Sequence, residues 1–411
     1  MAKVAIFSAR IGSDEDTAMT YAPHDRAIYD ADSHIMELPD FLQKYADPAV
    51  RDEIPAVSYS ASIVTDEEVA EIMARGGKHS DEHLAELLGL GDKLIEKSKE
   101  IQALGAFDGK ERKTAMDMLG FRRQLVFATH SVAMPFSPSS KIAPERRYGG
   151  ARAHNRHMSE FCSHDSRLMG AAIIPLDDPQ FALAELDFVL KTNLKAVWVP
   201  HRPCGDKSPG HVEFEPFWAK LAEAGVPFLL HVGGSPLQLA KAWGNNGRAA
   251  TKDWLGGGEN LRTKDVAVLH QGPETFISMM VIEGVFERHP KLRGASVELG
   301  AGWVPAMLTR LDWVAKHWGR TDQTLASFKR TPSEQLTEQM AFTPFVFEDV
   351  GAFIDQSNPD LYLFSSDYPH IEGGRNPIAR FEGALGERVP SVREKFYAEN
   401  FLRIFPEARA H

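Results

Sequence analysis

The chain has 411 residues, 43% of them hydrophobic, which is enough for a barrel-sized core. Its net charge of −11 at pH 7 argues against a surface for nucleic acid or an anionic membrane. Two cysteines cannot build a disulfide framework, no apolar run is long enough to span a bilayer, and the start lacks the long apolar stretch of a signal peptide. We therefore expect a cytoplasmic protein with no nucleic-acid or membrane partner.

The beginning of the chain divides into an extension and the start of one large domain. Residues 1–26 are predicted to form an N-terminal extension that lies over the domain or meets a partner, and residues 27–411 form the domain. The first strand is expected at about residues 27–32. Residues 48–120 are predicted to be a helical insertion after this strand, because the sequence at Thr65–Glu68 is a capping box that starts a helix. Such an insertion could wall a pocket or form a subunit contact.

From about residue 124 onward, short apolar runs alternate regularly with helical patterns. Further strands are predicted at or within residues 124–128, 168–174, 195–199, 227–230, 293–297, 337–347 and 361–365. Strands that alternate with helices are parallel, because each return needs a crossover, and eight such units predict a (β/α)8 TIM-type barrel of the α/β class. An open doubly wound sheet is the structural alternative, but no glycine-rich dinucleotide motif follows the first strand.

Polar side chains follow the predicted strands where each strand ends. In a barrel of this type, the carboxyl ends of the strands share the face where catalysis takes place. The residues at these ends are Asp32, His34, His130, His201, His231, Glu298 and Asp367. Asp32 and His34 are two residues apart, so their side chains point to the same side of an extended chain. Alone, this pair could equally be a turn cap and a hydrogen-bonded core histidine.

The strand-end residues include the ligand types that divalent metals prefer. Asp32, His34, His231 and Asp367 supply two imidazoles and two carboxylates, a mixed set that suits Zn²⁺, Mn²⁺ or Fe²⁺. We predict that these four residues hold one metal. Glu298 is predicted either to complete a second metal position or to act as an acid/base.

Four motifs resemble the amidohydrolase superfamily, in the branch that includes aminocarboxymuconate semialdehyde decarboxylase and the resorcylate and carboxyvanillate decarboxylases. They are Asp32-Ser33-His34 and the runs 228–231, 284–293 and 363–370, and the resemblance extends from about residue 27 to 405. It implies the barrel fold and the divalent metal, with zinc expected first and manganese or iron as alternatives. One departure concerns Glu298, which stands where these decarboxylases usually carry a catalytic histidine. His270 is the candidate replacement, or an added ligand of a second metal.

The leading hypothesis is a metal-dependent hydrolase or non-oxidative decarboxylase of a small, carboxylate-bearing substrate. Asp367 would be the general base of hydrolysis, and Glu298 or His270 would be the acid that protonates the carbon in decarboxylation. The resemblance also admits a dinuclear iron or manganese oxygenase, with Glu298 as the bridging carboxylate. A third possibility is a metal-binding subunit of a hetero-oligomer with a paralogous partner. Otherwise a homo-oligomer is expected.

Other polar residues near the strand ends are assigned to the substrate or to structure. His201, Arg202 and His370 are predicted to bind substrate. Equal alternatives are a hydrogen-bonded residue at the barrel rim for His201 and an ion pair for Arg202, and His370 could instead support a metal ligand. Asp30 is predicted to be a structural hydrogen-bonding residue. The glycine-rich segment 233–265 is expected to cover the metal pocket, with Trp243 or Trp254 as a lid residue. The last set comprises histidines expected at the surface: His154, His157 and His164.

Overall fold

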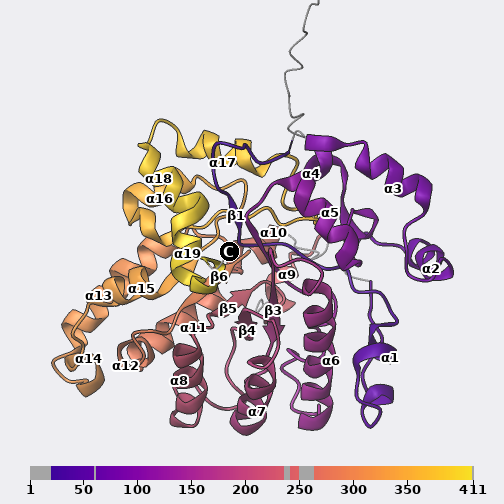
Figure 1. Cartoon of the computed structure of the whole chain (residues 1–411). Helices are drawn as coiled ribbons and strands as arrows, with labels where there is room; N and C mark the ends of the chain where they lie inside the picture. Colours follow the sequence, from indigo (N-terminus) through magenta and orange to yellow (C-terminus); the bar gives the residue numbers. More distant parts are fainter. Residues whose placement is uncertain (1–19, 60–61, 236–240, 250–262, 410–411) are drawn as a thin grey trace, which may run out of the picture.

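The computed structural model describes residues 20–59, 62–235, 241–249 and 263–409. Seven parallel strands pair in chain order at the centre of the molecule (Figure 1). They are β1 (Tyr29–Asp30), β2 (Arg123–Val126), β3 (Leu168–Ile173), β4 (Ala196–Trp198), β5 (Phe228–His231), β6 (Gly294–Val297) and β7 (Met340–Phe342). All their residues except Tyr29 are buried, as expected for strands that are covered on both faces.

The segment predicted as the eighth strand lies between β7 and β1, although it is not a regular strand. The Leu363 amide donates to the Phe342 carbonyl (3.0 Å) on one side, and the Ala31 amide donates to the Phe364 carbonyl (3.0 Å) on the other. The ladder breaks at Ser366, whose amide donates to the side chain of Asp30 (2.8 Å) instead of to a backbone carbonyl. The sheet therefore curls into the TIM-type arrangement, with an irregular eighth segment between its two edge strands.

Helices surround the strands and follow the predicted alternation (Figure 1). Proline occupies the first position of several of them, where its missing amide hydrogen costs nothing. After β2, the helices are α6 (Pro144–Cys162), α7 (Pro179–Val189), α8 (Glu215–Ala224), α9 (Lys241–Gly244), α10 (Thr263–Val268), α11 (Gln271–Ile282), α12 (Val285–Arg288), α13 (Val304–Trp318), α14 (Gln323–Ala326), α15 (Pro332–Gln339), α16 (Val350–Gln356), α17 (Pro377–Leu385), α18 (Pro390–Glu394) and α19 (Asn400–Ile404).

The chain between β1 and β2 is largely helical and packs against the loop that follows the eighth segment. Its helices are α1 (Phe41–Tyr45), α2 (Asp66–Ala74), α3 (Asp81–Leu88), α4 (Leu94–Lys97) and α5 (Gly109–Leu119). The capping box at Thr65 is formed, with the Glu68 amide donating to the threonine hydroxyl. Lys99 Nζ donates to the carbonyls of His370 (3.0 Å) and Gly374 (2.9 Å), which ties this region to the barrel mouth. Its status as an insertion over residues 48–120 stays a prediction.

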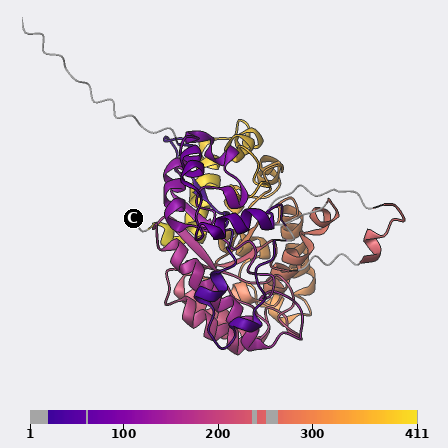
Figure 2. The same ribbon diagram turned by 90° about the vertical axis from the view of Figure 1, so that its right-hand side faces the viewer.

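Two predicted surface segments are only partly described. Of the N-terminal extension, residues 20–26 lie against α5 and α17, where the Tyr21 amide donates to the Met118 carbonyl (2.9 Å) and its hydroxyl donates to Asn376 (3.0 Å). In the predicted lid, residues 241–249 stand away from the barrel (Figure 2), and Trp243 is 75% exposed. Trp254 lies outside the described residues, so the lid stays a prediction. Within the described ranges, no helix is both long enough and apolar enough to cross a membrane.

Candidate metal centre

Two aspartates at the end of β1 have different surroundings. Asp30 accepts hydrogen bonds from the Ser366 hydroxyl (2.6 Å), the Ser366 amide (2.8 Å) and the Gln124 side chain (2.8 Å). Burial raises the pKa of Asp30 to about 7. These contacts join β1, β2 and the eighth segment, and they confirm the structural role predicted for Asp30.

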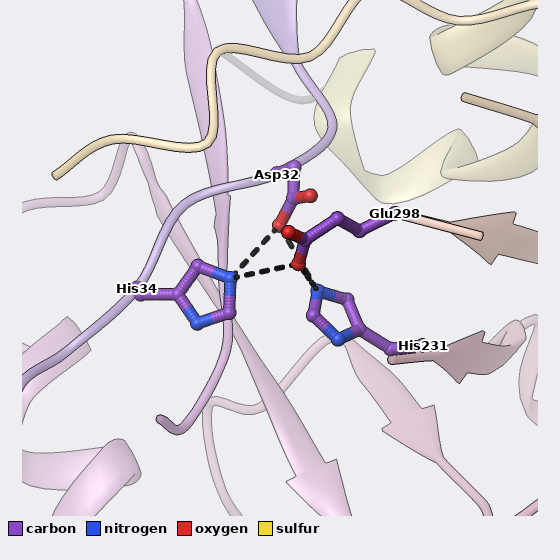
Figure 3. Close-up of side chains that lie close together, drawn as sticks. All are labelled: Asp32, His34, His231 and Glu298. Carbon is purple, nitrogen blue, oxygen red and sulfur yellow. Dashed lines mark hydrogen bonds and ion pairs between the residues drawn. The ribbon is translucent and has the colours of Figure 1, made fainter. Parts of the chain in front are cut away.

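Asp32, by contrast, faces two histidines, one close by in the sequence and one from a distant strand. Its Oδ1 lies 3.3 Å from His34 Nε2 and 3.2 Å from His231 Nε2, the latter at the end of β5. Glu298, just after β6, places its Oε2 3.4 Å from His231 Nε2 and 3.8 Å from His34 Nε2 (Figure 3). Each of these four residues offers a ligand atom within 4.8 Å of the others, and all four are buried. The structure thus brings together strand ends that are up to 266 residues apart in the chain (298 − 32).

Asp367 and His370 extend this group on the side of the eighth segment. Asp367 Oδ1 lies 3.5 Å from His34 Nε2 and 3.1 Å from His370 Nδ1. The ring of His370 stacks on that of His34 with centroids 3.9 Å apart. His34, Glu298, Asp367 and His370 form a second set of four ligand atoms within 4.8 Å of one another.

Both carboxylate residues after the strand ends have an unusual backbone. Glu298 has a φ of 52° and Asp367 a φ of 54°, in the left-handed region that costs such residues about 1–3 kcal/mol. The surrounding structure holds both in place: the Glu298 amide donates to the Thr343 hydroxyl (2.8 Å), and the Asp367 amide donates to the Asp32 carbonyl (2.9 Å). Strained residues of this kind concentrate at functional sites, which agrees with a site at this position.

In His34 and His231, the ring nitrogen that points away from the carboxylates lies at hydrogen-bond distance from a backbone carbonyl. This contact indicates whether the other nitrogen, which faces the carboxylates, carries a hydrogen or a lone pair. His34 Nδ1 lies 3.0 Å from the Ala128 carbonyl, and His231 Nδ1 lies 2.9 Å from the Val232 carbonyl. A carbonyl only accepts, so in a neutral ring Nδ1 carries the hydrogen and Nε2 presents a lone pair. Among the described residues, His34 Nε2 and both carboxylate oxygens of Asp367 make no hydrogen bond. Lone pairs that face carboxylates in a buried site fit a divalent cation between them.

The electrostatics of the cluster favour neutral rings for His34 and His370 and a protonated Asp367 when no cation is bound. Burial lowers the pKa of His34 to about 4 and that of His370 to about 3. Burial and the charge of Asp32 raise the pKa of Asp367 to about 8. Burial acts in the same direction on Asp32, but His231 and His34 outweigh it and hold the pKa of Asp32 well below its usual range. A cation entering this site would therefore displace the proton of Asp367.

A fully buried glutamate that the sequence reasoning missed, Glu37, lies after β1 and binds the loop that follows β2. The carboxylate of Glu37 accepts hydrogen bonds from the amides of Thr129 (3.2 Å), His130 (3.0 Å) and Ser131 (3.0 Å), and from the Ser131 hydroxyl (2.6 Å). Burial would raise its pKa, but His130 and these hydrogen bonds lower it to about 2. The same loop carries the Ala128 carbonyl that orients His34. The sequence signal, an acidic residue three positions after His34, does not distinguish this role from an exposed side chain.

Two residues predicted to bind or protonate the substrate have other surroundings. The guanidinium of Arg202 donates to Asp177 Oδ2 (2.8 Å) and to the Phe136 carbonyl (3.1 Å), so the structure has the ion pair that was the alternative. His270 immediately precedes α11, its side chain is 35% exposed, and it lies 4.0 Å from Glu274. His270 is in neither set of clustered ligand atoms, so its role as a proton donor or as a ligand of a second metal stays a prediction. It begins a helix beyond the strand ends, where local periodicity does not set the direction of a side chain.

Two further histidines, His201 and His154, are buried. His201 is 4% exposed and its Nδ1 makes no hydrogen bond within the described part of the chain, and its contact with substrate stays a prediction. His154, expected at the surface, is fully buried and pairs through Nδ1 with the Ser131 hydroxyl (2.9 Å). It faces the barrel from α6 and completes the group around Glu37.

Comparisons with known proteins identify the family. The amidohydrolase family model matches residues 36–406. A gamma-resorcylate decarboxylase of Rhodococcus jostii (strain RHA1) is 29% identical over 254 residues, which are 57% of this chain and 70% of that protein. The sequence similarity is thus concentrated on part of the chain, while the family match spans almost all of it.

Two solved structures match nearly the whole chain. The crystal structure of an amidohydrolase from Mycobacterium avium subsp. paratuberculosis K-10 has a TM-score of 0.71 and 24% identity, and it covers 93% of this chain and 100% of that one. A dihydroxybenzoic acid decarboxylase from Polaromonas sp. JS666, with bound manganese and the inhibitor 2-nitroresorcinol, has a TM-score of 0.59 and 17% identity, covering 94% and 98%. At these identities the two structures establish the fold alone. The family match and the resorcylate decarboxylase relative show that the chain belongs to the amidohydrolase superfamily, in the branch of aminocarboxymuconate semialdehyde decarboxylase, and is an enzyme of that class.

Proposed function

We propose that the chain is a metal-dependent non-oxidative decarboxylase of a small aromatic carboxylate, with one divalent cation held by Asp32, His34, His231 and Asp367. The observation that carries the proposal is the buried convergence of these side chains. Asp32 and Asp367 each place a carboxylate oxygen within 3.5 Å of His34 Nε2, and Asp32 Oδ1 also lies 3.2 Å from His231 Nε2. The sequence relative named as a gamma-resorcylate decarboxylase and the manganese-bound dihydroxybenzoic acid decarboxylase support it. The hydrolase alternative would use the same cation to act on an ester or amide.

The residues beside the cation position supply the other needs of the reaction. A bound divalent cation would polarise an oxygen of the substrate. Decarboxylation breaks the bond to the carboxyl carbon, and the ring carbon then needs a proton. Glu298 is the carboxyl group placed beside the cluster, with Oε2 3.4 Å from His231 Nε2, and we assign it the role of proton donor. Asp367, which also contacts the cation in this proposal, is the alternative proton carrier and would act as the general base of the hydrolytic reaction.

Aromatic side chains beside the cluster support an aromatic substrate. The ring centroid of Phe127 lies 4.2 Å from the ring centroid of His231, and the ring centroid of Trp198 lies 4.9 Å from it. The indole Nε1 of Trp198 and Nδ1 of His201 are buried and make no hydrogen bond among the described residues. We assign these two groups to polar substituents of the substrate, since each can supply a hydrogen-bond donor.

The test is carbon dioxide release by the full-length chain. Metal-depleted protein would be reloaded separately with Mn²⁺, Zn²⁺ or Fe²⁺ and given 2,6-dihydroxybenzoate and a panel of related hydroxybenzoates. We expect carbon dioxide release that depends on added metal and is absent with benzoate, which lacks a hydroxyl beside the carboxylate. Cleavage of esters or amides without carbon dioxide release would favour the hydrolase. Oxygen uptake would favour the dinuclear oxygenase.

Several finer assignments remain proposals. Zinc was expected first, but the manganese-bound structural neighbour makes Mn²⁺ the first metal to test. A homo-oligomer, a hetero-oligomer with a paralogous subunit and a cytoplasmic location are still predictions. Size-exclusion chromatography with light scattering would establish whether the chain assembles with copies of itself.

A further inference from the structure

A third carboxylate with a strained backbone lies at the barrel mouth, in the region between β1 and β2. Among the described residues, the non-glycine residues with a positive φ are Glu100, Glu298 and Asp367, and Glu100 has a φ of 54°. Glu100 is also 6% exposed, and both the left-handed backbone and the burial of a carboxyl group are unfavourable. It belongs to neither set of clustered ligand atoms, so metal binding does not explain a glutamate at this position.

Both the backbone and the side chain of Glu100 bond to the turn that follows Asp367. The Glu100 amide donates to the Pro369 carbonyl (3.0 Å), and Glu100 Oε1 accepts from the Ile371 amide (3.0 Å). We call residues 368–374 the Asp367 turn. The strained backbone of Glu100 thus accompanies two hydrogen bonds to one turn.

Ser98 and Lys99, which precede Glu100, contact the same turn. The Ser98 hydroxyl lies 3.0 Å from the Tyr368 hydroxyl, and Lys99 Nζ donates to two backbone carbonyls of the turn. Residues 98–100, which we call the clamp, therefore contact the Asp367 turn at most of its positions: Tyr368, Pro369, His370, Ile371 and Gly374.

The Asp367 turn needs such contacts because it leaves the strands shortly after Asp367. The Asp367 amide donates to the Asp32 carbonyl (2.9 Å), and the Tyr368 carbonyl accepts from the His34 amide (2.8 Å). From residue 369 onward, the turn bonds to the clamp instead. The clamp therefore supports the part of the turn that carries His370 and that fixes the chain direction after Asp367.

We propose that Glu100 is a positioning residue of the metal centre, which holds the Asp367 turn so that Asp367 and His370 face the other residues of the cluster. The inference rests on the proposed function in taking Asp367 as a metal ligand. It gives the segment between β1 and β2 a role at the barrel mouth that requires no contact with the substrate. The backbone strain at Glu100 is then a consequence of presenting its carboxylate to the Ile371 amide.

Three substitutions separate the carboxylate of Glu100 from its backbone. Glu100→Gln keeps an oxygen that can accept from the Ile371 amide, Glu100→Ala removes it, and Glu100→Gly removes it while permitting the positive φ. Burial and the charge of Glu372 raise the pKa of Glu100 to about 7, so glutamine resembles the protonated form of this side chain.

The first measurement is hydrogen–deuterium exchange of the metal-free full-length protein, followed by mass spectrometry. In the peptide that contains Ile371, we expect exchange to be about 3–10-fold faster in Glu100→Ala and Glu100→Gly, and close to wild type in Glu100→Gln. Unchanged exchange of this peptide in the alanine and glycine variants would overturn the proposal, because the turn would then be held without Glu100.

The second measurement is Mn²⁺ affinity by isothermal titration calorimetry, which a purely structural role would not change. We expect a fall of about 10–100-fold in both Glu100→Ala and Glu100→Gly, and wild-type affinity in Glu100→Gln. Glu100→Gly relieves the strain, so it should melt at a higher temperature than Glu100→Ala without recovering affinity.

The matched control lies on the same segment. Glu96 pairs with Lys97 (3.3 Å), and Glu96→Ala should bind Mn²⁺ as the wild type does. Wild-type affinity in Glu100→Gly, or affinities that follow the melting temperatures of the variants, would overturn the positioning role. If Glu100→Ala does not fold, Glu100→Gly decides.

The outcomes also separate this inference from the proposed function. Metal-dependent carbon dioxide release, with unchanged exchange and Mn²⁺ affinity in the glycine variant, overturns the role of Glu100 and leaves the decarboxylase. Faster exchange and weaker Mn²⁺ binding in that variant, without carbon dioxide release from any hydroxybenzoate, support the role of Glu100 and count against the decarboxylase. A wild-type chain that binds no divalent cation contradicts both.

Discussion

Two groups of buried polar side chains lie next to each other at the barrel mouth and differ in how their acceptors are paired. In the support group, formed by Glu37, Thr129, Ser131 and His154, the Glu37 carboxylate accepts three amides and a hydroxyl. In the metal cluster, formed by Asp32, His34, His231, Glu298, Asp367 and His370, imidazole lone pairs face carboxylates. Folding alone satisfies the first group, whereas the second needs a cation or protons from outside the chain. Whether the buried acceptors have hydrogen-bond donors within the chain thus distinguishes a structural polar group from a functional one.

The largest expected effect is at Glu298, where the metal cluster departs from the decarboxylases it resembles. Glu298→Gln keeps the size of the side chain and removes its charge and proton. If Glu298 donates the proton, kcat should fall by about 10²–10⁴-fold in a protein that still folds. Metal content measured alongside would show whether occupancy falls as well. Full activity with full metal content would make Glu298 structural and assign the proton chemistry to Asp367.

The support group should matter through the metal cluster rather than through chemistry of its own. Glu37→Gln weakens the carboxylate contacts that hold the β2 loop, and with it the partners of His34 and His370. We expect Mn²⁺ affinity to fall by about 10–100-fold, as for other residues that orient metal ligands. Glu185→Gln is the matched control, a buried glutamate paired with Arg152, and it should lower the melting temperature without changing the affinity. Equal metal affinity in the two variants would contradict the supporting role of Glu37.

A third test uses pH to distinguish the two groups. Burial and Asp32 raise the pKa of Asp367 to about 8 from an ordinary value of 3.8, so the cation must displace a proton below pH 8. Metal affinity should therefore fall by about tenfold per pH unit as the pH drops below this value. In the metal-free protein, the stability of the fold changes with pH in the opposite direction to metal affinity. The protonated Asp367 stabilises the fold at low pH, and this contribution is lost as the pH rises through 8.

Isothermal titration calorimetry at several pH values measures this linkage. In Asp367→Asn, the pH dependence of metal affinity that comes from the Asp367 carboxyl should disappear. In Glu37→Gln this pH dependence should remain, because the pKa of Glu37 is already low. A wild-type affinity that does not change between pH 6 and 8 would show that Asp367 is ionised before the metal binds.

The smallest effect on catalysis is expected at Arg202, which lies outside both groups. Its guanidinium is already engaged by Asp177 and by backbone carbonyls. Arg202→Gln should cost about 1–3 kcal/mol of stability through the unsatisfied partners it leaves, with KM for the substrate unchanged. Chemical denaturation and steady-state kinetics measure the two quantities separately. A large rise in KM without loss of stability would restore the substrate-binding role predicted from the sequence.

The sequence by itself determined the barrel and the residues that converge at its mouth. Apolar runs that alternate with helical patterns require parallel strands, and a residue at the end of such a strand must lie on the shared face. Asp32, His231, Glu298 and Asp367 were located in this way, because their placement depends on local periodicity. The sequence also located the eighth segment, although one of its backbone amides donates a hydrogen bond to the side chain of Asp30 instead of to a neighbouring strand.

Only the tertiary structure decided the roles of side chains in loops and at helix starts. His370 faces the cluster because Thr129, distant in the chain, accepts from its other nitrogen, and Arg202 is engaged because Asp177 lies beside it. His270 lies outside the cluster, and Glu37 and His154 are buried beneath the β2 loop. The physical reason is that such a side chain takes its direction from hydrogen-bond partners elsewhere in the chain. Local periodicity, which reveals strands and their ends, contains no information about those partners.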